Sequence, residues 1–187
     1  MLHQVRIVST EPHVPGYDRS CSPGHACSFG PAWSDDTTAP DGHNGCDTRH
    51  DVLREQLHHV VVDSNGCTLA SGLLVDPYTR RRMQYATEGS QIQIDHLVAL
   101  ATAWRMGAAH WPLSRRMRFA NDTRLELLAV SGRANESKGD SSPGQWLPVN
   151  RGFRCRFVSR YLRVVQAYDL AITGSDAASI RVTAGGC

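Results

Sequence analysis

Six cysteines constrain the fold of this 187-residue chain more than any other feature of its sequence. They stand at Cys21, Cys27, Cys46, Cys67, Cys155 and Cys187. No two have the close CxxC spacing that zinc sites usually use. A metal site at Cys21 and Cys27, with His25 between them, is kept as an alternative. Three disulfides are the preferred interpretation and imply an oxidising, extracellular setting, although spacing alone does not assign the pairs.

Length and composition predict a globular protein. Apolar residues make up 41% of the chain and charged residues 20%, as in ordinary soluble proteins, and the length suits one domain, residues 1–187, with a sizeable core. No stretch approaches the roughly 20 apolar residues that a membrane helix needs, so we expect no membrane partner. Residues 1–13 contain no apolar run typical of a signal peptide, so either a leader has been removed or none existed.

The charge is small in sum but uneven along the chain. The net charge is +2, and 19 of the 20 basic residues are arginine. The arginines cluster at 80–82, at 115, 116 and 118, and at 151, 154, 156, 160 and 163. Such clusters could follow a phosphate backbone, but for each cluster alone a solvated helix face is the preferred interpretation.

Local patterns predict an α+β chain with a loop-rich arm over residues 1–45. Apolar spacing, turn residues and caps predict the following elements: a helix from Asp47, a hairpin over 60–75 with its turn at 63–66, a strand over 92–96, a helix over 97–106 ended by Gly107, a short helix over 115–120, a strand over 125–130, a short helix with Asn135 and Lys138, and a helix over 150–169 capped by Asn150. Residues 150–187 form a C-terminal helical part.

The strand over 92–96 ends in Asp95 and His96, and this pair carries the chemistry. Adjacent residues on a strand point to opposite sides, so the two could face a metal and a water separately. Histidine suits a general base because its ordinary pKa is near neutrality. The Asp95 carboxylate and the Asn135 amide oxygen are ligands that a hard divalent cation accepts. Lys138, on the helical face of Asn135, could bind a phosphate oxygen.

Longer stretches carry a resemblance to a known family. They are Tyr17-Asp18-Arg19, Phe29-Gly30-Pro31-Ala32-Trp33, Gly45-Cys46-Asp47-Thr48-Arg49, Asp76-Pro77-Tyr78-Thr79, Ile94-Asp95-His96-Leu97-Val98-Ala99-Leu100, Ala103-Trp104, Gly107-Ala108, Phe119-Ala120-Asn121-Asp122, Leu127-Leu128-Ala129-Val130, Asn135-Glu136-Ser137-Lys138-Gly139-Asp140 and Trp146-Leu147-Pro148. Together they span roughly residues 17–168. The chain resembles the secreted actinobacterial and phage-encoded HNH nuclease-like family, related to the C-terminal domain of GmrSD-type restriction enzymes.

The resemblance implies a ββα-metal (HNH, or His-Me finger) core over residues 92–140. It implies that His96 is the general base and that Asp95 and Asn135 bind one divalent cation. It also implies the disulfide Cys46–Cys67, makes Cys155–Cys187 plausible and leaves Cys21–Cys27.

One position departs from the family. The middle residue of the HNH triplet is usually an asparagine that braces the catalytic histidine, and Glu126 stands there instead. We predict that Glu126 orients His96 by accepting its Nδ1 hydrogen and that its charge raises the imidazole pKa. Two alternatives stay open: Asn121 reaches in, or activity is reduced.

Other candidate residues carry weaker signals. Arg49 could contact phosphate or pair with Asp47 or Asp51 to hold the arm. The aromatic residues Tyr78, Trp104, Trp111 and Trp146 could stack on bases, but core packing is the preferred interpretation. His58, His59 and His110 are interpreted as surface residues without a role.

The sequence therefore predicts an extracellular, monomeric endonuclease that hydrolyses DNA, and possibly also RNA, with little sequence specificity. Its cofactor would be one divalent cation, Mg²⁺ first, with Mn²⁺, Ca²⁺ and Zn²⁺ as alternatives. A phage-encoded cytoplasmic role is the alternative location. The rival functions are a nucleic-acid-binding protein that keeps the fold without catalysis, and a non-catalytic extracellular module whose Asp95-His96 pair is structural.

Overall fold

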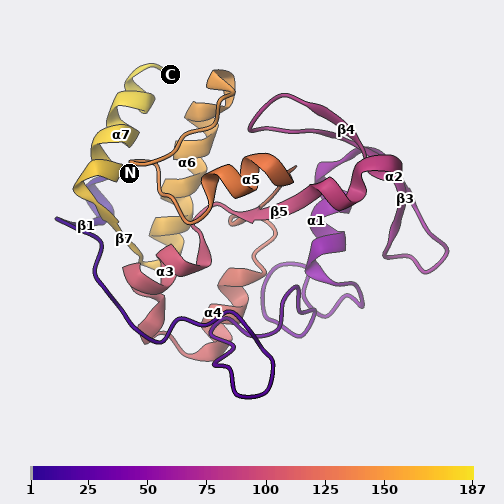
Figure 1. The fold of residues 1–187 in the computed structure, drawn as a ribbon, viewed down its shortest axis with the longest axis horizontal. Coiled ribbons are helices and arrows are strands. Elements are labelled where there is room, and N and C mark those ends of the chain that lie inside the picture. The colour runs from indigo at the N-terminus through magenta and orange to yellow at the C-terminus, as the bar shows by residue number, and fades with distance from the viewer. Residues whose placement is uncertain (1) are drawn as a thin grey trace.

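The computed structural model describes residues 2–187, except for the side chain of His3, and has a mixed α+β fold (Figure 1). Its elements are η1 (Leu2–Gln4), β1 (Arg6–Val8), α1 (Thr48–Gln56), β2 (His58–Val62), β3 (Leu69–Val75), β4 (Arg82–Gln84), α2 (Tyr85–Glu88), η2 (Gly89–Gln91), β5 (Ile92–His96), α3 (Leu100–Met106), η3 (Ala108–His110), α4 (Leu113–Ala120), β6 (Leu127–Ser131), α5 (Gly132–Lys138), α6 (Arg151–Tyr168), β7 (Ala171–Thr173) and α7 (Gly174–Gly185). The strands form three small sheets, ordered β1-β7, β2-β3-β4 and β5-β6. The predicted α+β class is confirmed.

Strands β5 and β6 form an antiparallel pair, and α5 follows β6 without a loop. Ile94 lies opposite Ala129 and His96 opposite Leu127. Helix α5 packs back on both strands (Figure 1). Every residue of β6 is buried, so its register is fixed by apolar packing on both faces. The predicted strand over 92–96 is confirmed, and the second strand begins two residues later than predicted.

The segment after β5 is not helical where we predicted a helix from Leu97. Helix α3 begins at Leu100. The main-chain N–H of Leu97 donates to the Glu126 carbonyl, and that of Val98 donates to Glu126 Oε1. Because these two donors are already bonded to Glu126, just before β6, the helix begins three residues later than predicted. The end of the helix at Gly107, with φ of 146°, is as predicted.

A second layer is formed by α1 and the sheet β2-β3-β4. Asp47 caps α1 by accepting the N–H of His50. Strands β2 and β3 pair antiparallel around the predicted turn, in which Gly66 adopts φ of +78°. Val52 and Leu53 of α1 are fully buried in a core cluster that also contains residues of β5 and β6. This layer supports one face of the β5-β6 pair.

The largest core cluster surrounds α6, and the predicted apolar stripe of this helix is confirmed. Phe153, Phe157, Val164, Val165 and Tyr168 are all buried. Asn150 begins the helix, but its side chain does not cap it and donates instead to the Pro77 carbonyl at 2.8 Å. Core packing is also confirmed for the four aromatic residues named above: Tyr78 and Trp111 are buried in this cluster, and Trp104 and Trp146 pack against it.

The N-terminal arm is loop-rich as predicted, but it also contains β1. This strand pairs in parallel with β7, which places Ile7 opposite Ile172 (Figure 1). Farther along, the Trp104 indole of α3 donates to the Pro15 carbonyl and Arg118 of α4 donates to the Thr38 carbonyl. The arm therefore runs along the outside of α3 and α4.

Three disulfides fasten the chain, at Cys21–Cys27, Cys46–Cys67 and Cys155–Cys187. All three pairs are those that the family resemblance suggested, and the alternative of a metal at Cys21 and Cys27 is wrong because their sulfurs are bonded to each other.

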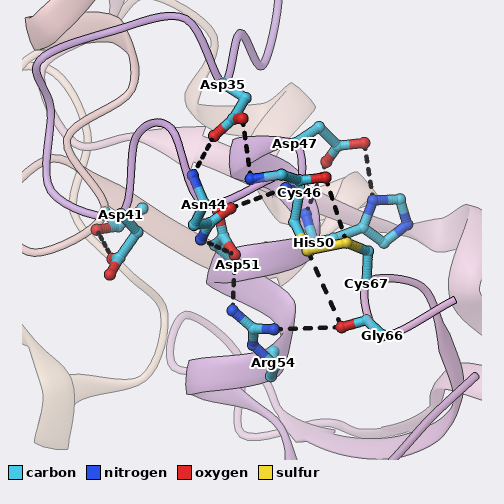
Figure 2. A network of polar contacts seen from close by, with 12 residues as sticks. Asp35, Asp41, Asn44, Cys46, Asp47, His50, Asp51, Arg54, Gly66 and Cys67 are labelled. Atoms are coloured by element: carbon cyan, nitrogen blue, oxygen red, sulfur yellow. Dashed lines mark hydrogen bonds and ion pairs between the residues drawn. A yellow bond between two sulfur atoms is a disulfide. The ribbon is translucent and has the colours of Figure 1, made fainter.

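The disulfide Cys46–Cys67 lies within a polar network at the start of α1 (Figure 2). Asp35 accepts the N–H groups of Asn44 and Gly45, and Asp51 accepts from Asn44 and Arg54. These contacts hold the end of the arm against α1.

Candidate functional site

Strand β5, the middle of α5 with the residues that follow it, and the arm line a cavity of about 300 Å³. Its polar lining residues are Gln93, Asp95 and His96 on β5, Asn135 and Glu136 on α5, Tyr17 and Arg19 on the arm, and Asp140 after α5. The structure therefore brings Asp95, His96 and Asn135 to one cavity. Of the other predicted site residues, Glu126, Lys138 and Arg49 are not among those that line it.

Asp95 is buried, and both of its carboxylate oxygens are bonded. Tyr78 donates its hydroxyl to Oδ2, and Lys138 donates from Nζ to Oδ1 at 2.8 Å. Burial raises the pKa of Asp95, while the Lys138 ammonium and the Tyr78 hydroxyl oppose this rise. Burial also raises the pKa of Tyr78, which keeps its hydroxyl proton available for donation. Asp95 is thus held in one orientation by two donors.

Lys138 is not placed for the phosphate contact that we predicted. Its residue is 1% exposed, and Nζ donates both to Asp95 and to the His96 carbonyl at 2.8 Å. The face of α5 that carries Lys138 packs on the strands, so the ammonium lies under the site rather than in the cavity. Its role here is to compensate the buried carboxylate, because an unpaired buried charge would be strongly destabilising.

His96 is fixed through one ring nitrogen. Nε2 lies 2.9 Å from the Ala120 carbonyl oxygen, which can only accept, so Nε2 carries the hydrogen. In the neutral ring Nδ1 then keeps its lone pair. Within residues 2–187, the buried side-chain polar atoms without a partner are Arg116 Nε, Asn121 Oδ1 and Glu126 Oε2, so the unpartnered Nδ1 remains open to solvent. Burial lowers the pKa of His96 to about 3, and Arg19 and Lys138 contribute to the lowering.

The predicted brace between Glu126 and His96 is absent, and the pKa of His96 is lowered rather than raised. Glu126 is fully buried, and its Oε1 accepts the Val98 N–H at 3.1 Å. Burial raises the pKa of Glu126 well above its usual range, while the Lys138 ammonium and the Val98 N–H oppose this rise. The alternative brace is also absent, because Asn121 Nδ2 donates to the Met117 carbonyl and Asn121 Oδ1 has no partner in the described residues. The hydrogen-bond partner of His96 is the main-chain carbonyl of Ala120. Because every residue has such a carbonyl, the sequence could not identify this partner.

Asn135 is oriented by Gln93, a residue that the sequence analysis did not single out. Asn135 Nδ2 donates to Gln93 Oε1 at 2.8 Å, and Gln93 Nε2 contacts Glu136 Oε1 at 3.3 Å. Gln93 and Asp95 are two positions apart on β5 and therefore share one side of the strand. This spacing was the sequence signal that could have identified Gln93. The hydrogen bond to Gln93 places the Asn135 amide on the side of β5 that carries Asp95.

A second, smaller cavity adjoins the other side of His96. Trp33 lies parallel to the imidazole, with ring centroids 5.7 Å apart and an angle of 12° between the planes. Trp33 lines this cavity together with Phe29 and Ala120. Arg19 and His96 line both cavities. Arg19 and Trp33 lie within two of the motifs that carry the family resemblance, which were the available signal, but neither residue was predicted to have a role.

Arg49 and the exposed histidines lie elsewhere. Arg49 donates to the Ile92 carbonyl at 2.8 Å and so ties α1 to β5. It makes neither of the predicted pairs, because Asp51 pairs with Arg54 and Asp47 with His50. His58, His59 and His110 are exposed, as predicted.

Oxygen and nitrogen donors line the first cavity, and its carboxylates are those of Asp95, Glu136 and Asp140. Within residues 2–187, no cluster of three or more His, Cys, Asp or Glu side chains is arranged to hold a metal ion. A cation at Asp95 and Asn135 would therefore have two protein ligands. Mg²⁺ is commonly held through one or two carboxylates, with water and substrate phosphate completing its shell, so this donor set fits that ion.

Comparison with known proteins gives one informative match. The chain is 36% identical over 136 residues to a protein of the fungus Arthroderma benhamiae named as an uncharacterized secreted protein. The match covers 72% of this chain and 65% of that protein, so the chain matches less than two thirds of the relative's length. No family model matches the chain, and no solved structure matches it.

The secreted relative and the three disulfides are consistent with an extracellular location. None of the helices in residues 2–187 combines the length and the apolar character needed to cross a membrane.

Proposed function

We propose that this chain is an extracellular endonuclease that hydrolyses phosphodiester bonds of DNA, with RNA as a second substrate and little sequence specificity. One observation carries the proposal: His96 is fixed through Nε2, keeps its Nδ1 lone pair and shares a cavity with Asp95 and Asn135. The arrangement of β5, β6 and α5 supports the ββα-metal fold that the family resemblance implies.

His96 would act as the general base. The Ala120 carbonyl holds the Nε2 hydrogen, so Nδ1 is the atom that can take a proton from an attacking water. The low pKa keeps the ring unprotonated over the whole neutral range. A phosphodiester bound beside the ring would add a negative charge and raise this pKa toward the value that proton transfer requires. The stacked Trp33 ring keeps the imidazole plane from turning.

Asp95 and Asn135 would hold one divalent cation, Mg²⁺ first, through a carboxylate and an amide oxygen. When bound, such a cation stabilises the negative charge that builds on the phosphate and on the leaving oxygen. The charge of the cavity supports the need for a cation. Asp95, Glu136 and Asp140 line the cavity and would repel a phosphate. Tyr78 and Lys138 fix the carboxylate that faces the cavity.

The same contacts support a second candidate, a nucleic-acid-binding protein that keeps this fold without catalysis. Lys138 already places a positive charge against Asp95, and this contact compensates the carboxylate without a metal. In that case Arg19 and Trp33 would still be available to a polynucleotide, and EDTA would not change binding.

Nicking of a supercoiled plasmid separates these candidates. We expect cleavage with Mg²⁺ and its loss with EDTA. We expect His96→Ala to lower the rate by roughly 10²–10⁴-fold, which is the usual contribution of general-base catalysis. His110→Ala is the matched control, because His110 is exposed and lines neither cavity. A His96→Ala variant that cleaves at the rate of this control would refute the assignment.

Calorimetric titration with Mg²⁺ or Mn²⁺ tests the cation. Asn135→Ala should weaken binding, whereas Asp95→Ala is less informative because it leaves the buried Lys138 ammonium without its carboxylate partner and destabilises the fold. His110→Ala is the control, since His110 is exposed and lines neither cavity. Equal binding by wild type and Asn135→Ala would place the metal elsewhere.

A further inference from the structure

Arg19 is the cationic side chain that the arm brings to both cavities around His96. It lines the larger cavity with Asp95 and Asn135 and the smaller one with Trp33. Its residue is exposed, and in the described chain its guanidinium has no hydrogen bond or ion pair. The neighbouring cations are engaged: Arg105 pairs with Glu11 and Asp140, and Lys138 pairs with Asp95.

The main chain on both sides of Arg19 is held in place. Asp18 accepts the N–H groups of Ser20 and Ala26 and contacts His25 Nδ1 at 2.7 Å. These backbone hydrogen bonds lower the pKa of Asp18, so the carboxylate remains charged and keeps its contacts. The disulfide Cys21–Cys27 closes the same loop. An arginine on so constrained a segment, without a partner of its own, is preorganised for a ligand.

The residue before Asp18 fixes the segment to the core. Tyr17 packs edge-on against Phe29, with ring centroids 6.3 Å apart, and contacts Trp104 at 6.2 Å. Phe29 is 3% exposed and belongs to the largest core cluster. The position of Arg19 is therefore set by the core rather than by a free loop.

We propose that Arg19 is the phosphate-binding residue of this cleft and holds one phosphodiester of a polynucleotide beside His96. This inference rests on the proposed function and assigns to Arg19 the task that we first predicted for Lys138. A guanidinium can donate two parallel hydrogen bonds to the two free oxygens of a phosphodiester.

The charge of the cleft favours a phosphodiester over a terminal phosphate. A phosphodiester carries one negative charge, whereas a phosphomonoester approaches two. Glu136 is exposed, lines the same cavity and makes no ion pair in residues 2–187, so it repels the second charge. The cleft therefore suits internal positions of a strand rather than its phosphorylated ends.

The test measures binding apart from cleavage. Every variant is made in the His96→Ala background, and fluorescence anisotropy follows a labelled 12-nucleotide single strand and a labelled duplex in Mg²⁺ over a series of salt concentrations. We expect Arg19→Ala to raise Kd by about 10-fold or more, since hydrogen bonds to charged groups contribute about 1.5–3 kcal/mol. The slope of log K against log salt should fall by about 0.7 for the single strand and about 0.9 for the duplex, which is one phosphate contact.

Two further variants make the result specific to this guanidinium. Arg19→Lys should keep the salt slope and recover only part of the affinity, because an ammonium cannot form the paired contact. Arg181→Ala removes the same charge from the exposed face of α7, outside both cavities, and should change neither value. Melting temperatures of all variants should match, since Arg19 has no partner within residues 2–187 to lose.

The outcomes separate this inference from the proposed function. If the wild type nicks plasmid in an EDTA-sensitive way but Arg19→Ala binds like Arg181→Ala, Arg19 does not bind phosphate and the nuclease assignment stands. If the wild type fails to nick while Arg19→Ala still weakens binding with the smaller slope, the phosphate site stands and catalysis is lost. Equal binding together with absent nicking overturns both.

Discussion

The state of each side chain at this site follows from which of its atoms are already bonded. His96 has one ring nitrogen committed to a main-chain carbonyl and one left open, so its tautomer is fixed before any substrate arrives. Glu126 is also fully buried, yet its Oε1 accepts from the Val98 N–H, and burial raises the pKa of its carboxyl group. The Glu126 carboxyl group therefore supports the turn after β5 without contacting the imidazole.

The low pKa of His96 predicts an unusual pH profile. The profile of kcat/KM, which reports the free enzyme, should lack an acid limb near the ordinary value of 6.5 and fall only as pH approaches about 3. The free energy of unfolding should also depend on pH. Below pH 6.5 His96 binds a proton in the unfolded chain but not in the folded protein. This group therefore lowers stability as pH falls from 6.5 to about 3, by up to about 1.4 kcal/mol per pH unit.

NMR titration of ring-labelled histidine measures this pKa directly, and His96→Ala identifies its signal. A His96 signal that titrates between pH 6 and 7 would contradict the buried, Nε2-bonded ring.

Among the elements, those that carry the site could be predicted from sequence, whereas the contacts between them could not. The alternating residues of β5, the Ser131-Gly132 step into α5 and the apolar stripe of α6 are local patterns, and each produced the expected element. The late start of α3 depends on donors satisfied by Glu126, which stands 28 positions after Val98. The same holds for Lys138, whose contact with Asp95 follows from how α5 packs on β5.

The disulfides act on different elements and should separate stability from function. Replacing Cys46 and Cys67 by serine frees the start of α1 from the β2–β3 loop (Figure 2) and should cost roughly 3 kcal/mol, because the bridge closes 21 residues. Replacing Cys21 and Cys27 should cost less, about 2 kcal/mol for a separation of 6, yet lower polynucleotide binding more, because that loop carries Arg19.

Denaturant unfolding and anisotropy on the two double variants supply the comparison for this prediction. The prediction would be contradicted if the Cys46 and Cys67 variant lost more stability and also more polynucleotide affinity. In that case the Cys21–Cys27 disulfide would not be needed to hold the Arg19 loop for binding.

At the scale of the whole molecule, the two ends of the described chain are joined by β1 and β7. Each strand has three residues, and the paired residues Arg6 and Ala171 are separated by most of the chain, so no local pattern announces the pairing. The sequence analysis assigned residues 1–45 to an irregular arm for this reason. Leu2, Val5 and Val8 pack against the main core, which the arm's polar composition concealed.

Deleting residues 2–9 should therefore destabilise the molecule without touching either cavity. Three partly buried apolar side chains would be lost, together with the partner of β7, for roughly 2–3 kcal/mol. Replacing Ser9 and Thr10 by glycine is the control, since both are exposed. Thermal unfolding gives the answer: a deletion variant that melts with the control would mean that β1 contributes nothing to the fold.

The pairing of β1 with β7 also sets an order of events during synthesis. A chain that emerges from its N-terminus carries β1 for more than 160 residues before Ala171–Thr173 appears. The residues that line the larger cavity, from Tyr17 to Asp140, have all emerged by then. The pairing of β1 with β7 is therefore among the last long-range contacts that a chain growing from its N-terminus can make, and it closes the fold after the residues of both cavities are present.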